Sequence, residues 1–176
     1  MKRRKTALKS IRIPKDLLAI LEEDSIDRGI SFNSLVSSLL TKYVEWERYT
    51  ERFGFVTMTS SFFHMLLEAT DASKLKQLTL ERQNEILYDI MLFWFHEISP
   101  LSFINALMLI GKYTNLFRIE VTYSTSSCTT IVIKHGHGQR NSEHLEYHLG
   151  EVIRRHFKVT PEITNTSSSL LIKLAI

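Results

Sequence analysis

The chain has 176 residues, of which 44% are hydrophobic, and its mean hydropathy is −0.06. These values exclude a disordered chain and predict a folded, soluble protein with room for more than one small core. One cysteine, Cys128, excludes an internal disulfide and fits a reducing cytoplasm. The most apolar stretch, residues 90–110, contains His96, Glu97 and Pro100, so it predicts two buried helices and no membrane span.

Positive charge is concentrated at the N-terminus. Residues 1–15 carry seven basic side chains and no acidic one, and the whole chain has a net charge of +3, so residues 16–176 sum to 3 − 7 = −4. A basic arm on a mildly acidic body is typical of a nucleic-acid-binding protein. A solvated tail would carry the same charge, but the residues that follow the arm favour the binding function.

A short strand and two helices are predicted directly after the arm. Ile11 and Ile13 alternate with polar residues, which indicates a half-buried strand that ends at Pro14. An amphipathic helix follows from residue 15 and ends at Arg28-Gly29, because glycine readily takes the left-handed cap conformation. Ser31 caps a second helix, whose apolar stripe runs over residues 35–44.

Residues 5–46 resemble the ribbon-helix-helix family of DNA-binding transcription regulators. The string Ile-Arg-Ile-Pro leads into the first helix, and Gly-Ile-Ser-Phe-Asn-Ser-Leu opens the second, in the order and spacing of that family. The resemblance implies that two chains pair their strands into an antiparallel ribbon, which enters the major groove of double-stranded DNA. It therefore implies a homodimer or a higher homo-oligomer, with a DNA-binding domain over residues 1–48.

The same resemblance implies which residues touch DNA. Leu8, Ser10 and Arg12 share the strand face that reads base edges, and Arg12 can pair bidentately with guanine. Leu8 departs from the usual polar residue, and Lys9 falls on the face of Ile11 and Ile13. The full predicted DNA-contact set is Arg3, Arg4, Lys5, Leu8, Lys9, Ser10, Arg12, Ser31, Phe32 and Asn33, of which the last three open the second helix, where free amides attract phosphate.

The rest of the chain, residues 49–176, predicts a helical middle and a C-terminal α+β module. Helices are expected from Ser60 or Ser61, from Asp71, over residues 86–94 and from Pro100, with Gly111 as the last stop. Residues 53–56 are expected to form a hinge or a short strand between the domains.

Alternating apolar residues predict four strands and a helix after Asn115. Strands are expected over 117–123, 130–134, 159–163 and 170–174, with polar turns at 125–128 and 164–167 and a helix from Asn141 or Ser142. A β-β-α-β-β module of this kind suits oligomerisation or the sensing of an effector, although a fold alone does not define a function.

Four of the seven histidines lie close together in the sequence of this module: His135, His137, His144 and His148. A His-x-His pair and a helical pair four residues apart are reasonable ligands for zinc, nickel or copper. A ribbon-helix-helix domain joined to such a module is similar to the nickel-responsive repressors, which place a cysteine after the His-x-His pair. Here Cys128 comes before His135, so the ligand set of those repressors is not transferred.

Two other roles remain open for the histidine cluster. The glycine-rich turn 135–140 could bind an anion or a small effector through its amides and Arg140. Alternatively, the histidines are structural or lie in an interface.

Catalytic motifs are missing from the sequence. It contains no P-loop, no dinucleotide-binding glycine motif, no His-Glu-x-x-His and no nucleophile elbow, so no enzymatic activity is expected. The sequence therefore predicts a cytoplasmic, nucleoid-associated transcription regulator, a repressor by its resemblance. The alternatives are an antitoxin-type autorepressor that binds a partner protein, and a metal- or anion-binding interaction protein whose arm contacts RNA.

Overall fold

A computed structural model describes residues 7–50, 52–79, 81, 84–123 and 128–175 of the chain. The α+β class predicted from the sequence is confirmed by its helices and its four-stranded antiparallel sheet. The chain divides into two compact units, with Tyr49 the last residue of the first and Thr50 the first residue of the second.

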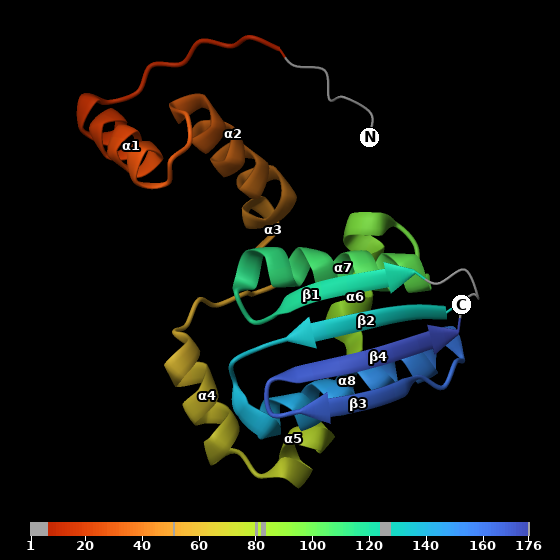
Figure 1. The fold of residues 1–176 in the computed structure, drawn as a ribbon. Coiled ribbons are helices and arrows are strands. Elements are labelled where there is room, and N and C mark those ends of the chain that lie inside the picture. The colour runs from red at the N-terminus through yellow and green to blue at the C-terminus, as the bar shows by residue number, and fades with distance from the viewer. Residues whose placement is uncertain (1–6, 51, 80, 82–83, 124–127, 176) are drawn as a thin grey trace. The chain divides into compact units, whose positions relative to one another are not determined.

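The first unit is a pair of helices preceded by an extended segment (Figure 1). Helix α1 spans Lys15–Asp27 and helix α2 spans Phe32–Lys42; the chain continues as a π-helical turn, η1, over Tyr43–Glu47 and a last short turn, α3, over Arg48–Thr50. Gly29, at a φ of +63°, makes the predicted break between the two helices. Helices α1 and α2 pack against each other, and Leu35 of α2 is buried.

The predicted strand at residues 10–14 does not form in the single chain. Residues 7–14 belong to neither a helix nor a strand, because no second strand lies beside them to complete a ladder of hydrogen bonds. The strand was predicted as half of a ribbon paired across a dimer, so it stays a prediction. It requires a partner strand from outside the chain.

The second unit begins with four helices. They are α4 (Ser60–Ala69), α5 (Ala72–Leu78), α6 (Asn84–Phe95) and α7 (Pro100–Thr114). The Asp71 carboxylate caps α5, as predicted, whereas α4 is capped by Thr59, one residue earlier than expected. The segment at 53–56 forms no strand; Phe53 instead packs on the core of this unit and stacks on Trp94 at 5.2 Å.

Helix α7 starts at Pro100, as predicted, with a capping box between Ser99 and Ser102. It does not stop at Gly111. It continues to Thr114 and ends at Asn115, whose φ of +55° is left-handed. Gly111 serves packing instead, because a Cβ there would lie 3.0 Å from the carbonyl oxygen of Phe117.

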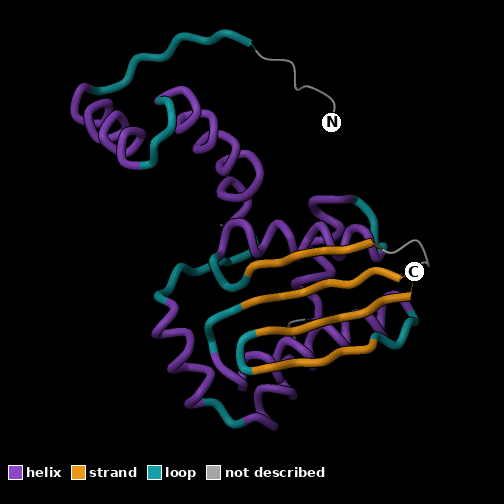
Figure 2. Tube along the Cα trace, viewed as in Figure 1, coloured by secondary structure: helices purple, strands orange, loops and turns teal. Residues whose placement is uncertain are grey.

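The sheet and a long helix complete the unit in the order β-β-α-β-β (Figure 2). Strands β1 (Arg118–Tyr123) and β2 (Cys128–Lys134) form one hairpin, β3 (Glu162–Thr166) and β4 (Ser169–Ala175) form the other, and α8 (Gly138–Phe157) connects them. The strand order is β1-β2-β4-β3.

Three predicted boundaries in this module were misplaced. Cys128 was placed in a turn with residues 125–127, which lie outside the described residues, but it begins β2. Helix α8 begins at Gly138, three residues before Asn141, and β3 begins at Glu162 and runs through most of the predicted turn at 164–167. Pro161 explains the late start of β3, because proline has no amide to donate to the ladder.

Helices α7 and α8 cover one face of the sheet, and the described elements of this unit leave the other face open (Figure 1). The covered face carries the buried residues Ile131, Ile133, Leu170, Ile172 and Leu174, which pack with residues of α6, α7 and α8 in one core. The open face carries two surface ion pairs, Lys134–Glu120 at 2.8 Å and Lys173–Glu162 at 3.0 Å.

Within the described ranges, no single helix is long and apolar enough to cross a membrane. Residues 86–95 and α7 reach the required length and hydropathy only when taken together, and the two helices are bent by 100° at the break between them.

Candidate functional site

The basic arm supplies the predicted base-reading residues. Leu8, Lys9, Ser10 and Arg12 are all exposed, and Leu8 is 99% exposed. Arg3, Arg4 and Lys5 lie outside the described residues. Nothing within the described part of the chain covers the polar side chains of the arm, so they are available to a ligand.

The first unit also exposes an unusual amount of apolar surface. Ile11 is 66% exposed, and six apolar residues of the two helices and the following turn are between 44% and 60% exposed: Leu17, Ile20, Leu39, Leu40, Tyr43 and Val44. These residues include most of the predicted stripe on the second helix. Exposed apolar side chains in this number favour an interaction surface.

The start of α2 has the geometry of an anion-binding helix terminus. The Ser31 hydroxyl oxygen accepts a hydrogen bond from the Ser34 amide at 3.1 Å, which is an ordinary N-cap. The amides of the first helical turn, at Phe32 and Asn33, precede that bond and belong to the group that has no partner within a helix. They retain the capacity to bind a phosphate.

The four histidines of the second unit do not form one site. The rings of His135 and His137 lie 6.2 Å apart at the end of β2, and the rings of His144 and His148 lie 6.1 Å apart on α8. Among the residues that the structure describes, no group of three or more His, Cys, Asp or Glu is placed to hold a metal ion. The predicted four-histidine metal centre is therefore not formed, because a strand end and a helix face direct the two pairs to different neighbours.

His135 belongs to a buried hydrogen-bonded chain. Its Nδ1 accepts a hydrogen bond from the His137 amide at 3.3 Å, so its Nε2 carries the proton and donates to the Ser142 hydroxyl at 2.8 Å. Ser142 in turn donates to the carbonyl oxygen of Thr166. These hydrogen bonds connect the end of β2 to α8 and to the β3–β4 hairpin.

This serine–histidine pair lacks the arrangement of a nucleophile and its base. The imidazole that would remove the Ser142 proton already carries a proton on the nitrogen that faces it. Ser142 is also fully buried, so a substrate cannot reach its hydroxyl. Burial, followed by the neighbouring His137, lowers the pKa of His135 and keeps the imidazole neutral.

His137 and Arg140 hold helix α4 against the start of α8. The His64 Nδ1 on α4 donates to the His137 carbonyl oxygen at 3.2 Å, and the Phe63 ring meets the His137 ring edge-on at 5.2 Å. Arg140 donates to the carbonyl oxygen of Glu68 at 2.6 Å and to that of Leu67 at 3.4 Å. Arg140, which the sequence suggested for an anion site, is thus engaged with the C-terminal end of α4.

His144 and His148 lie on the side of α8 that faces α5 and the residues after it. The Thr79 hydroxyl donates to the Leu75 carbonyl at 2.8 Å and lies 3.5 Å from the His144 Nδ1. The Nδ1 of His148 is enclosed and has no hydrogen-bond partner among the described residues. Burial, followed by the neighbouring His144, lowers the pKa of His148 to about 4.

The sequence did not indicate the partners of these histidines. His64 and His137 are 73 residues apart, and no local pattern connects them. The helical spacing of His144 and His148 did predict that they share a face, and that relation is confirmed.

The chain was compared with family models, with curated proteins and with solved structures, and nothing matches it. Its function is therefore argued from the residues and contacts described above.

Proposed function

We propose that the protein is a dimeric, sequence-specific DNA-binding transcription regulator. Residues of the first unit bind the duplex, and the second unit adds oligomerisation or effector sensing. The observation that carries the proposal is the basic arm that runs directly into a helix pair with an exposed apolar surface.

The exposed apolar side chains of the first unit support the proposal that the protein is a dimer. Ile20, Leu40 and Val44 are each at least half exposed in the single chain. Because these side chains are already partly buried, covering each of them against a second copy would contribute about half of the ~1.5–3 kcal/mol gained by burying a fully exposed side chain. A second copy would also bring a second arm, which is what a strand at residues 10–14 requires for its hydrogen bonds.

The positive charge of the arm supports the proposal that the first unit binds DNA. Seven cations in the first fifteen residues can contact successive phosphates, and Arg12 has the planar donor pair that matches the O6 and N7 atoms of guanine. The Ser31–Asn33 turn would hold a phosphate and fix the position of the ribbon without reading sequence. A regulator of this kind works in the cytoplasm, on the nucleoid.

The antitoxin alternative receives no specific support. The partner-binding region of such proteins is often short and disordered, whereas residues 50–176 of this chain have their own hydrophobic core. We therefore expect the second unit to serve the regulator itself.

The test is selection of bound duplexes from a random library by the full chain at fixed salt. The expected result is enrichment of one sequence made of two related half-sites, because a two-fold symmetric dimer reads a site of matching symmetry. Recovery of duplexes without any shared sequence would contradict specific binding, and preferential recovery of single-stranded RNA from a mixed pool would favour the interaction protein.

A further inference from the structure

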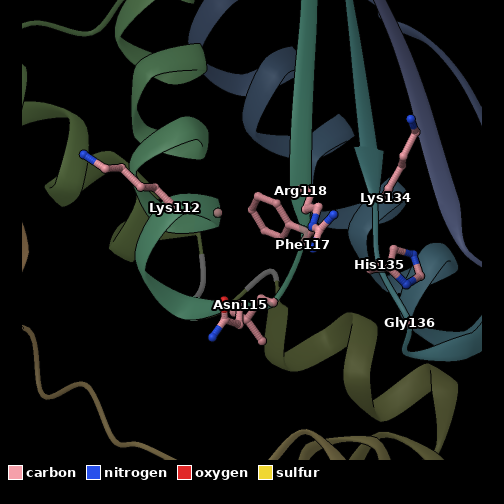
Figure 3. Close-up of a pocket in the computed structure, with 9 residues that line it drawn as sticks. Lys112, Asn115, Phe117, Arg118, Lys134, His135 and Gly136 are labelled. Atoms are coloured by element: carbon pink, nitrogen blue, oxygen red, sulfur yellow. The ribbon is translucent and has the colours of Figure 1, made fainter. Parts of the chain in front are cut away.

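The second unit contains a hollow that none of the roles above uses. It has a volume of about 570 Å³, within the size range of small-molecule sites (Figure 3). Three segments line it: the end of α7 with the turn after it, the start of β1, and the end of β2 with Gly136. All of these residues belong to one compact unit, so the hollow is a property of that unit alone.

Close packing defines the inner side of the hollow. Gly111 of α7 approaches Phe117 so closely that a Cβ would lie 3.1 Å from its ring, and Phe117 is only 7% exposed. Asn115 turns the chain from the helix into the strand in a left-handed conformation. Leu116 and Phe117 give the hollow an apolar part beside its charged part.

The charge of the lining is entirely positive. Three of its nine residues are permanent cations, Lys112, Arg118 and Lys134, and none is acidic. The Lys134 ammonium lies 2.8 Å from Glu120, and the Lys112 ammonium lies over the Tyr113 ring. For Arg118 the structure records no ion pair or hydrogen bond with any described residue, so its guanidinium remains free for a ligand.

Arg118 and Lys134 are direct partners across the β1–β2 ladder. Side chains of directly paired residues lie on the same face of a sheet, and like charges in that position destabilise the pair. Figure 3 shows that the Lys134 side chain is directed away from Arg118. Because Glu120 already neutralises Lys134, an anion at this place would meet Arg118 as its cation.

We propose that this hollow binds a small molecule through a phosphate or carboxylate group held by Arg118, with an apolar part of the ligand against Leu116. A guanidinium is the preferred partner of both anions because its parallel N–H groups match two oxygens at once. The proposal concerns the second unit alone and holds whether or not the first unit binds DNA.

The hollow also adjoins the segment after β2, which contacts α4. Lys134, His135 and Gly136 line it, and the next residue, His137, holds His64 and Phe63 of α4. A ligand in the hollow therefore contacts the segment that fixes α4, which gives it a physical route to the helical part of the unit.

The test titrates the full chain with inorganic pyrophosphate and, separately, with citrate at constant ionic strength, by calorimetry and by amide NMR. We expect saturable binding of at least one of the two anions, with the largest amide shifts at Gly111, Leu116 and Gly136. The Arg118→Gln variant should bind about tenfold more weakly or worse, because it loses a hydrogen-bonded charge pair, and Arg118→Lys should fall between the two.

Arg155→Gln is the matched control, since it removes the same charge from an exposed position on α8 and should leave binding unchanged. Both glutamine variants should keep the wild-type melting temperature in the absence of anion, because both positions are exposed. No saturable binding of either anion up to millimolar concentration would overturn the proposal, as would equal losses in Arg118→Gln and Arg155→Gln. Loss of duplex-DNA affinity in Arg118→Gln without any binding of the small anions would overturn it too, and would assign the surface to DNA.

Discussion

Arg12 is the residue on which base recognition depends in the proposed regulator. It is exposed, and it lies one position from Ile11 and Ile13, which would face the helices in a paired ribbon. We expect Arg12→Ala to weaken binding to the selected duplex by about 1–3 kcal/mol for each base pair that Arg12 contacts, and to relax the preference there. Fluorescence anisotropy on the selected duplex and on a scrambled one measures both effects.

Arg28→Ala is the control for this variant. Arg28 is an exposed arginine of the same unit that lies outside the arm. Its guanidinium forms an ion pair with Asp24 of α1 at 3.5 Å. If Arg28→Ala and Arg12→Ala lose the same affinity for both duplexes, the arm contributes charge and does not read sequence.

His148 makes the stability of the second unit depend on pH. Its pKa is lowered to about 4 in the folded state, against an ordinary 6.5 in the unfolded chain. As the pH falls below about 6.5, His148 binds a proton in the unfolded state but not in the folded state. The free energy of unfolding therefore decreases until about pH 4. The full loss from this one residue is up to about 3 kcal/mol.

Urea unfolding at several pH values between 7 and about 4 measures this loss. We expect His148→Leu to show a smaller decrease in stability over that range, because leucine does not titrate. His96→Asn, which replaces an exposed histidine, should keep the wild-type dependence. Parallel curves for His148→Leu and the wild type would show that another group causes the decrease.

At the scale of the elements, α4 is held by contacts at its middle and at its C-terminal end. Arg140 binds the carbonyl oxygens at its C-terminal end, while His64 and Phe63 contact the His137 segment. We expect Arg140→Gln to weaken this attachment by about 1–3 kcal/mol, since carbonyl oxygens lose a charged donor. Hydrogen exchange should then become faster in α4 and stay unchanged in β2 and β4.

Arg155→Gln is again the matched control, and it should leave the exchange of α4 amides as in the wild type. Equal exchange of α4 in the Arg140→Gln variant and the wild type would show that apolar contacts, such as that of the buried Leu67, hold the helix without Arg140.

Local sequence signals predicted most of these elements. Pro100 and Asp71 mark helix starts, and alternation over residues 117–123 marks β1, because caps and periodicity act within a few residues. Gly111 was misread as a helix end because its tight contact with Phe117 is a tertiary contact that leaves no local signal. The sequence left the role of the histidine cluster open for the same reason: sequence proximity does not say that β2 and α8 direct the two pairs apart.

The hollow was not visible in the sequence either. Arg118 and Lys134 are 16 residues apart, and only the register of the β1–β2 hairpin makes them direct partners. A known hairpin register would have been enough to find this pair of like charges.

At the scale of the whole molecule, the two units differ in how complete they are. The second unit encloses a core of sixteen buried residues from helices α6–α8, the strands and the chain next to β1. The first unit buries Leu35 but leaves Ile20, Leu40, Tyr43 and Val44 more than half exposed. The proposed dimer would cover this exposed surface with a second copy of the chain, whereas the second unit has a core formed by its own elements.

Sedimentation of the full chain with and without the selected duplex tests the proposed dimeric regulator most directly. We expect a dimer at micromolar concentration and a complex of two chains on one duplex, because each half-site takes one arm of a paired ribbon. A folded monomer at that concentration, or a complex that contains one chain per duplex, would contradict it.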